Sequence, residues 1–228
     1  MLFGGPQFIS IIEIGKRCGK EFGIGISREM EKTSKTASSE NAIAAINGSY
    51  FDMKYGNSVC FLKNKKNIID TTTASELKLR VNGAIYIKKG KLKIIEWNKK
   101  IEKNYKKHRG TTIASGPIML KNGKICNWNS CGKNFIEAKH PRSGIATTNE
   151  GKTLFITADG RSANNAIGMS IPEFAYLIKI MNGKEALNLD GGGSTTLWNA
   201  GNVINHPCDN KKFDNNGERK VANIIFVK

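Results

Sequence analysis

A single carboxylate, Asp190, follows an alternating apolar run and is followed at once by three glycines, Gly191–Gly193, and by the hydroxyl side chains of Ser194 and Thr195. Three successive glycines cost more backbone entropy than an ordinary turn requires. They are typical of a place where a ligand approaches the backbone closely, or where amide N–H groups converge on an anion. A tight turn between two strands is the alternative, but such a turn needs neither the carboxylate nor the hydroxyls. We therefore predict a ligand site at this glycine-rich segment.

Two further segments place polar side chains where an apolar strand should end. Asp159 and Arg161 follow the apolar run at 154–158, and this run is itself preceded by a hairpin that begins near His140. Asn47 follows the apolar run at 44–46, and Asp52 comes shortly after it. Binding and catalytic residues concentrate on loops that a rigid scaffold positions. We therefore expect the three strand ends to form one composite site at one edge of a sheet.

Seven motifs along the chain, in order, resemble the phosphodiester glycosidase family, which has many bacterial members. Any one motif alone would be a weak signal, but the ordered set is specific, and it covers about residues 43–227. The first forty residues and the lysine-rich middle of the chain carry little of the resemblance. The motifs are AINGSYFD, SGPIML, HPRSGIATT, LFITADGRS, GMSIPEFAYLI, ALNLDGGGSTTLW and ERKVANIIFV.

The resemblance implies a substrate in which a sugar, such as N-acetylglucosamine, is joined through its anomeric carbon to a phosphodiester. Cleavage of the sugar–oxygen bond expels a phosphomonoester, which needs charge neutralisation more than a strong proton donor. The planar guanidinium of arginine suits this task. Three of the seven arginines, Arg142, Arg161 and Arg219, lie inside motifs, and we predict that they bind the phosphate. Salt bridges at strand ends are the alternative.

The sugar side of such a reaction needs carboxylates, because its transition state is oxocarbenium-like. We predict Asp190 and Glu218 as the catalytic pair, with Asp159 close behind them. The alternative role for Asp159 is to orient an arginine, and the alternative role for Asp52 is only to cap a turn. Whether the reaction retains or inverts configuration depends on the carboxylate separation, which a sequence does not give.

Other polar residues of the motifs are predicted to contact the substrate. The Gly192 and Gly193 amides, with Ser194 and Thr195, would cradle the phosphate or a sugar oxygen. His140 is a candidate general acid or phosphate contact, although the proline that follows it makes a structural loop role almost as good an interpretation. Asn47, Asn188 and Asn205 would bind sugar hydroxyls or hold loops. We predict no metal site and no cofactor, since the acidic stretch at 209–218 lacks calcium-loop spacing.

The net charge of +17 is unevenly distributed. Residues 1–139 hold 26 Lys and Arg against 11 Asp and Glu, whereas residues 140–228 are nearly balanced, with 10 against 8. No nucleic-acid-binding motif accompanies this charge, so we expect no specific nucleic acid partner. Attraction of an anionic polymer or of a phosphorylated substrate is the milder consequence. The five cysteines are odd in number and lack zinc-site spacing, which favours reduced thiols.

The periodicity predicts strands near 8–14, 24–26, 43–47 and 221–227, with hairpins around Lys89-Gly90 and Asn122-Gly123. A short polar helix is expected over 34–42 and an amphipathic surface helix near 97–108. The strongest helix signal is 171–181, where Ser170 and Glu173 form a capping box. We therefore predict one α+β domain over residues 1–228, with a mixed, largely antiparallel sheet and a few flanking helices.

Three functions remain open at this stage. The first is hydrolysis of a sugar-1-phosphodiester in glycans or cell-envelope polymers. The second is a non-catalytic module that binds an anionic glycan or envelope polymer. The third is an intracellular enzyme or sponge for a nucleotide-derived ligand. The start of the chain, 1–6, has no signal-peptide pattern and no apolar run is long enough to span a membrane, and neither the localisation nor the oligomeric state is predicted.

Overall fold

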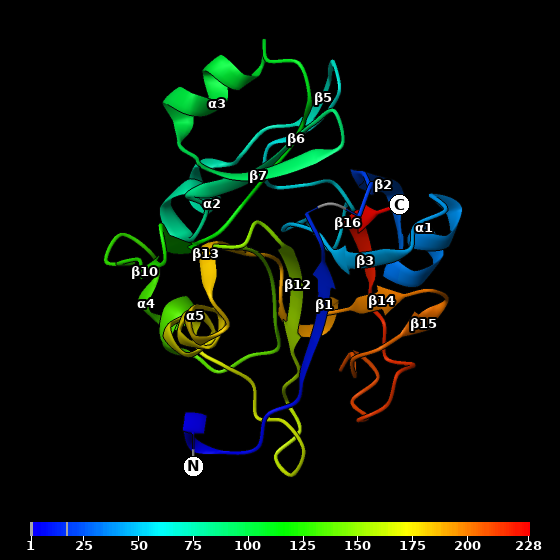
Figure 1. Cartoon of the computed structure of the whole chain (residues 1–228), viewed down its shortest axis with the longest axis vertical. Helices are drawn as coiled ribbons and strands as arrows, with labels where there is room; N and C mark the ends of the chain where they lie inside the picture. The colour runs from blue at the N-terminus through cyan, green and yellow to red at the C-terminus, as the bar shows by residue number, and fades with distance from the viewer. Residues whose placement is uncertain (1, 17) are drawn as a thin grey trace.

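The computed structural model describes residues 2–16 and 18–228. Its sixteen strands form three sheets in which every strand pair is antiparallel, and short helices lie at their outer faces (Figure 1). This arrangement confirms the predicted α+β class with its largely antiparallel character, and it divides the strands among three sheets.

The first sheet has six strands and carries the segments on which the predicted site depends. In spatial order they are β1 (Ile9–Ile14), β12 (Thr153–Ala158), β11 (Arg142–Thr148), β13 (Gly183–Asn188), β9 (Ile118–Lys121) and β10 (Lys124–Ile125). Helix α5 (Ile171–Ile180) packs against it with Phe174, Ala175 and Ile178. The predicted capping box is present, since Ser170 Oγ accepts from Glu173 N at 3.3 Å and Glu173 Oε2 accepts from Ser170 N at 2.8 Å.

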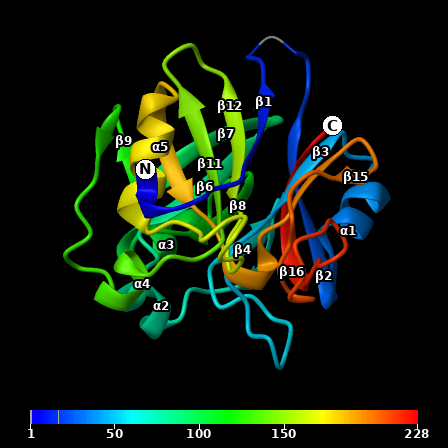
Figure 2. The same cartoon turned by 90° about the horizontal axis from the view of Figure 1, so that it is seen from below.

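The second sheet has five strands, pairs β2 with the C-terminal strand β16 and lies beside the glycine-rich segment. In spatial order they are β15 (Asn202–Val203), β14 (Leu197–Asn199), β3 (Ala44–Asn47), β16 (Lys220–Val227) and β2 (Phe22–Lys32). Helix α1 (Thr33–Ser39) covers this sheet through the buried Ala37. Figure 2 shows α1 and α5 on opposite sides of the molecule, each outside its own sheet.

The third sheet lies in the lysine-rich part of the sequence. Its strands, in spatial order, are β5 (Asn67–Asp70), β4 (Leu62–Asn64), β8 (Thr111–Ser115), β6 (Gly83–Lys88) and β7 (Lys91–Glu96). Helices α2 (Ala74–Leu79) and α3 (Lys99–Tyr105) flank it, and Phe61 and Trp97 pack beneath them. Both predicted hairpins are present, with Lys89 (φ 51°) and Asn122 (φ 50°) at their turns.

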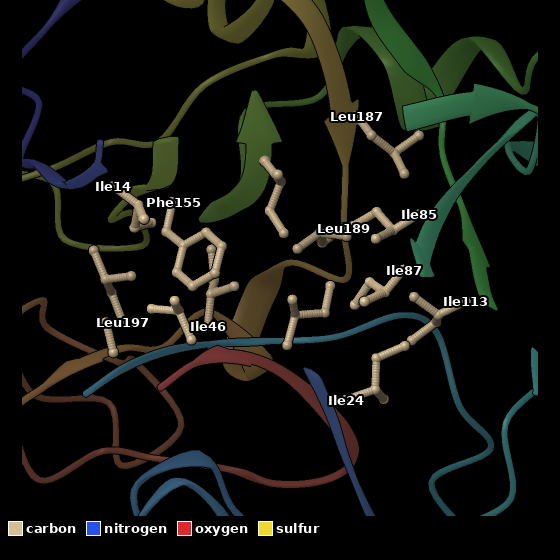
Figure 3. Packing of buried hydrophobic residues seen from close by; sticks show 14 of the residues in the cluster. Ile14, Ile24, Ile46, Ile85, Ile87, Ile113, Phe155, Leu187, Leu189 and Leu197 are labelled. Atoms are coloured by element: carbon tan, nitrogen blue, oxygen red, sulfur yellow. The ribbon is translucent and has the colours of Figure 1, made fainter. Parts of the chain in front are cut away.

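One hydrophobic core joins the three sheets. It contains Phe155 from the first sheet, Ile46 from the second and Ile85 from the third, all fully buried (Figure 3). Because each sheet turns one apolar face toward this common core, its strand ends are held rigidly where the sheets meet. The short elements η1 (Leu2–Gly4), α4 (Lys133–Glu137) and η2 (Gly192–Ser194) complete the fold.

None of the helices in the described part of the chain is both long and apolar enough to cross a membrane. All five cysteines are free, and Cys126 and Cys131 do not form a disulfide bond. In residues 2–16 and 18–228, no three side chains of His, Cys, Asp or Glu converge in the way that metal ligands would.

Candidate active site

The glycine-rich segment lies where the first and second sheets meet. Asp190 N donates to Gly48 O at 3.0 Å, which ties the end of β13 to the turn after β3. Gly192 N donates to Pro141 O at 2.9 Å, next to the start of β11. The polar strand ends that we expected at one edge of a single sheet are thus brought together at a junction between two sheets.

The Asp190 carboxyl is partly buried at this junction, and its Oδ1 accepts a hydrogen bond from Gly191 N at 3.0 Å. Burial raises the pKa of Asp190 above its ordinary value. The neighbouring Ser194 hydroxyl, the Arg80 and Arg219 guanidinium groups and the Gly191 N–H act in the opposite direction. Burial thus opposes the charge of the carboxyl and two cations favour it, so this charge responds strongly to its surroundings.

The glycines of the segment let two guanidinium groups approach the backbone. Gly192 has φ 62°, and a Cβ at this position would lie 3.0 Å from Arg161 Nη2. A Cβ at Gly193 would overlap Arg219 Nη2 and would lie 2.5 Å from Asp209 Oδ1. Side chains at these two positions would displace the arginines, which explains in physical terms why this stretch is made of glycine.

A cationic cavity of about 360 Å³ lies beside this glycine loop. Its lining includes four cations and one carboxylate: Arg161, Lys211, Lys212, Arg219 and Asp209. A concave wall with one dominant sign of charge attracts an oppositely charged ligand. The cavity therefore fits an anion such as a phosphodiester.

The two arginines of this cavity differ in their partners. Arg219 pairs with Asp209 Oδ1 through Nε at 2.9 Å and Nη2 at 2.5 Å. Arg161 makes no ion pair within the described residues, and its Nη1 lies 3.8 Å from Cys208 Sγ. Arg161 also has φ 63°, a conformation that L residues other than Asn and Asp adopt rarely. Its guanidinium is therefore free to bind an anion.

Arg80, whose charge acts on Asp190, is stacked on Tyr50. The Arg80 guanidinium carbon lies 3.6 Å from the centre of the Tyr50 ring. Glu76 holds Arg80 by two hydrogen bonds, to Nε at 2.7 Å and to Nη2 at 2.9 Å. The Tyr50 hydroxyl accepts from Asn188 Nδ2 at 2.9 Å, and burial raises the pKa of Tyr50, so this group stays neutral. Arg80 is thereby a fixed cation in the field of Asp190.

The carboxylate of Asp159 is buried and bound by neighbouring residues. Its side chain is 1% exposed, and it accepts hydrogen bonds from Asn205 Nδ2 at 2.8 Å, His206 N at 2.8 Å and His206 Nδ1 at 3.0 Å. Burial raises the pKa of Asp159, and the Asn205 and His206 hydrogen bonds oppose this rise. Asn205 Nδ2 also donates to Thr195 O at 3.1 Å. The geometry favours a role in positioning the glycine loop over direct catalysis.

Arg142 is the first residue of β11, and His140 lies two residues before this strand. Arg142 is 2% exposed, and it donates from Nε to Met169 O at 2.9 Å and from Nη2 to Ala138 O at 2.7 Å and Phe135 O at 3.1 Å. These bonds favour a structural role for Arg142 over phosphate binding. Burial, together with the positive charges of Arg142 and Arg161, lowers the pKa of His140. His140 is therefore neutral at physiological pH.

The hydrogen bonds of Glu218 and Asp52 are made to groups other than those of the glycine-rich segment. Glu218 accepts from Ser34 N at 2.9 Å through Oε1 and from Ser34 Oγ at 2.5 Å through Oε2, so it caps the first turn of α1. Asp52 Oδ1 accepts from the backbone N of Lys54 at 2.7 Å and of Tyr55 at 3.0 Å. The geometry favours the alternative for Asp52, in which it caps a turn. It likewise favours a capping role for Glu218 over a catalytic one.

The three predicted asparagines hold the strand ends together. Asn47 Nδ2 donates to Asp190 O at 2.7 Å, and Asn188 Nδ2 donates to Leu189 O at 2.7 Å. In contrast, the hydroxyls of Thr195 and Thr196 are buried without a hydrogen-bond partner within the described part of the chain. Buried hydroxyls normally find a partner, but Ser194, Thr195 and Thr196 are at most 1% exposed, so none of the three hydroxyls is open to a ligand in this conformation.

Sequence reasoning missed several residues of this region. Tyr50 lies inside a quoted motif, and His206 directly follows Asn205 and precedes a proline as His140 does, so both had a signal in the sequence. Arg80 had none, because it lies among lysines far from any motif. Only the packing of α2 against Tyr50 brings Arg80 to the site.

Comparison with known proteins gives the family and the fold of the chain. The family described as phosphodiester glycosidase matches residues 40–228. The mouse N-acetylglucosamine-1-phosphodiester alpha-N-acetylglucosaminidase is 29% identical over 95 residues, which cover 41% of this chain and 18% of the mouse protein. The chain thus aligns with only a small part of that relative.

Three solved structures share the fold. The catalytic domain of the zebrafish N-acetylglucosamine-1-phosphodiester alpha-N-acetylglucosaminidase, auto-inhibited by its pro-peptide, superposes with a TM-score of 0.73 at 18% identity, covering 97% of this chain and 82% of that one. A hypothetical protein from Synechocystis gives 0.72 at 14% identity over 98% and 59% of the two chains. A putative exported protein from Burkholderia pseudomallei gives 0.72 at 13% identity over 98% and 74%. With a family match that spans most of its length and a shared fold, the chain belongs to the phosphodiester glycosidase family.

Proposed function

We propose that this protein hydrolyses a glycosyl phosphodiester and releases the sugar. The observation that carries the proposal is the position of Asp190, a carboxyl with a raised pKa that directly precedes the glycines against which two cavity-lining arginines, Arg161 and Arg219, lie. This arrangement pairs a nucleophile or base for the sugar with cations for the phosphate. Membership of the family supports the same reaction class.

The chemistry follows from the two halves of the site. Arg161 and Arg219 would bind the phosphodiester oxygens and neutralise the charge that develops as the phosphomonoester leaves. Asp190 would act at the anomeric carbon, either directly as a nucleophile or as the base that activates water. The bond between the anomeric carbon and the bridging oxygen breaks, and the water oxygen ends on the sugar. The phosphate is a good leaving group, so a strong general acid is not required.

N-acetylglucosamine is the first sugar to test, because the named mouse and zebrafish relatives carry it in their names. The experiment measures hydrolysis of a chromogenic N-acetylglucosamine-1-phosphodiester by the wild type and by Asp190→Asn. We expect kcat of the variant to fall by about 10²–10⁴-fold, the range for loss of a positioned acid or base. Its thermal midpoint should not fall, because a carboxyl with a raised pKa is less favourable in the folded state than in the unfolded state at neutral pH.

Glu218→Gln is the matched control, since it neutralises the other predicted catalytic carboxylate, which accepts a hydrogen bond from Ser34 N in α1. It should retain most of the activity. Carrying out the reaction in heavy-oxygen water, with mass spectrometry of the products, shows which bond breaks, and we expect the label on the sugar. A parallel reaction with a chelator tests the prediction that no metal is needed.

Two results would contradict the proposal. An active Asp190→Asn enzyme would remove Asp190 from the mechanism, and label on the phosphate would show cleavage of the phosphorus–oxygen bond. A wild type that binds the phosphodiester without turnover would point to the non-catalytic binding module. A nucleotide that copurifies with an inactive protein would point to the nucleotide-derived ligand.

A further inference from the structure

A second cationic groove lies between the second and third sheets, away from the glycine loop. Its volume is about 810 Å³, and it shares no lining residue with the cavity lined by Arg161 and Arg219. Arg219 directly precedes β16, whereas Phe226 and Lys228, at the far end of this strand, line the groove. At the rise of an antiparallel strand, the two sites are roughly 25 Å apart.

The rim of the groove is positive and its charges are unpaired. Five cations line it, from two hairpin turns, a loop and the end of β16: Lys65, Lys88, Lys89, Arg109 and Lys228. The same lining holds only two carboxylates, Glu21 and Glu40. None of the five cations forms an ion pair with any residue that the structure describes.

Two of these lysines occupy turn positions that lysine disfavours. Lys65 has φ 55° and Lys89 has φ 51°, in the left-handed region where Gly, Asn and Asp are the usual residues. Strain of this kind, held at a surface next to a cavity, is a reason to look for a function. Both positions place a charge on the rim where a better turn former would carry none.

The spread of the cations indicates an extended ligand. A site for one phosphate concentrates backbone N–H groups and buried cations around a point, whereas here the cations are exposed and come from four separate segments around a volume of about 810 Å³. Neither of its two aromatic side chains is exposed, since Phe22 is half-buried and Phe226 is 4% exposed, with Lys228 Nζ 5.3 Å from the centre of the Phe226 ring. Single-stranded nucleic acids are held by exposed aromatic side chains that stack on the bases, and this groove offers none.

We infer that the groove binds a polymer that carries phosphate groups along its chain and has no bases. The inference goes beyond the hydrolysis proposed above, because binding here needs neither Asp190 nor turnover. If that hydrolysis holds, the groove would retain the distal part of a polymeric phosphodiester while its terminal sugar reaches the glycine loop.

The test measures binding of fluorescently labelled inorganic polyphosphate at about 50 and about 200 mM salt, the range over which polyanion binding changes steeply. The groove variant combines Lys65→Asn, Lys89→Asn and Arg109→Gln. Asn suits the left-handed turn positions, so the first two changes remove charge without adding strain. The control combines Lys124→Gln, Lys179→Gln and Lys184→Gln, three exposed lysines outside the groove, and has the same net charge as the groove variant.

We expect the groove variant to lose about tenfold or more in affinity at the lower salt, and its slope of log K against log salt to fall by about 2–3. The control should change less than about twofold. Equal losses in both variants, or no loss in the groove variant, would overturn the inference. The inference would also be overturned if an oligothymidine of equal charge bound as tightly as polyphosphate and if this binding were lost in the groove variant. The groove would then be a nucleic acid interface. Since the readout is binding, failure of the hydrolysis proposal leaves this result unaffected.

Discussion

The glycine-loop junction and the lysine-rich layer of β4 to α3 carry positive charge in different ways. Between positions 62 and 109 the chain holds fifteen Lys and Arg against four Asp and Glu, and α3 exposes Lys99, Lys100 and Lys103 to solvent. The junction has few charges, but Arg161 and Arg219 lie against glycine backbone and Arg80 is stacked on Tyr50. The comparison shows that the fixed position of a charge, more than the number of charges, marks where chemistry is expected.

Even within the lysine-rich layer, the one buried lysine has a structural role. Lys63 is 2% exposed, and its Nζ donates to Tyr105 O at 3.1 Å and to Lys106 O at 2.8 Å, at the end of α3. Burial lowers the pKa of Lys63. In this layer the exposed lysines therefore create the positive electrostatic potential, whereas the buried lysine stabilises the folded structure. Among the cations of the layer, only Arg80 contributes to the junction.

We expect the largest difference in kcat/KM between the two regions when the unpaired arginine of each is replaced, Arg161 near the junction and Arg109 in the layer. Arg161→Asn removes a cation at a left-handed position that asparagine tolerates. A lost charged hydrogen bond costs about 1.5–3 kcal/mol, so kcat/KM for the phosphodiester should fall about 10–100-fold. Arg109→Asn, an unpaired arginine of the layer, should change it less than about twofold, and similar losses in both variants would break the comparison.

A smaller effect should follow from filling the space that the loop glycines leave open. In Gly193→Ala the new methyl group would push against Arg219 and Asp209, and overpacking of this kind costs about 1–3 kcal/mol. We expect kcat/KM to fall about tenfold, since the displaced guanidinium would no longer face the phosphate that we propose it binds. Gly15→Ala is the control, because a Cβ there meets nothing within 4 Å. If Gly193→Ala keeps full activity, the position of Arg219 does not matter.

Much of the fold was predictable, because its signals are local. The capping box at Ser170, the Lys89-Gly90 turn and the apolar run of β16 each depend on residues close together in the sequence, and each is present in the structure. The division into three sheets was not predictable. It depends on which strands pair across long distances, such as β3 with β16, and a single sequence carries no record of that.

The site was predictable only in part, for a related reason. Sequence reasoning found Asp190 because the glycines that accommodate Arg161 and Arg219 leave a visible pattern. It could not distinguish Asp190 from Glu218, because both are carboxylates in motifs next to glycine. Only the contact with Ser34, far away in the sequence, gives Glu218 its capping role. Residue type was visible in the sequence, but the partner of each residue was not.

A pH profile of kcat/KM tests whether Arg80, which belongs to the lysine-rich layer, lowers the pKa of Asp190. Burial raises the pKa of Asp190 and Arg80 opposes this rise, so Arg80→Gln should raise that pKa further. If Asp190 reacts as the carboxylate, activity is lost as the pH falls through its pKa, and the acid limb of kcat/KM must move to higher pH in the variant. Arg109→Asn should leave the limb in place. A limb unchanged in Arg80→Gln would mean that Arg80 only stabilises α2 and Tyr50.

The smallest effect is expected from the exposed lysines of α3. Lys99→Gln with Lys103→Gln should change the free energy of unfolding by no more than about 0.5 kcal/mol, as surface substitutions usually do, and should leave turnover of a small phosphodiester within about twofold. Lys63→Met, in the same layer, should instead cost about 1–3 kcal/mol, because the carbonyls of Tyr105 and Lys106 lose their donor. Urea denaturation gives both values. If the double substitution in α3 lowered the free energy of unfolding as much as Lys63→Met, the exposed lysines would also stabilise the folded state. The distinction between exposed lysines that supply potential and a buried lysine that supplies stability would then be wrong.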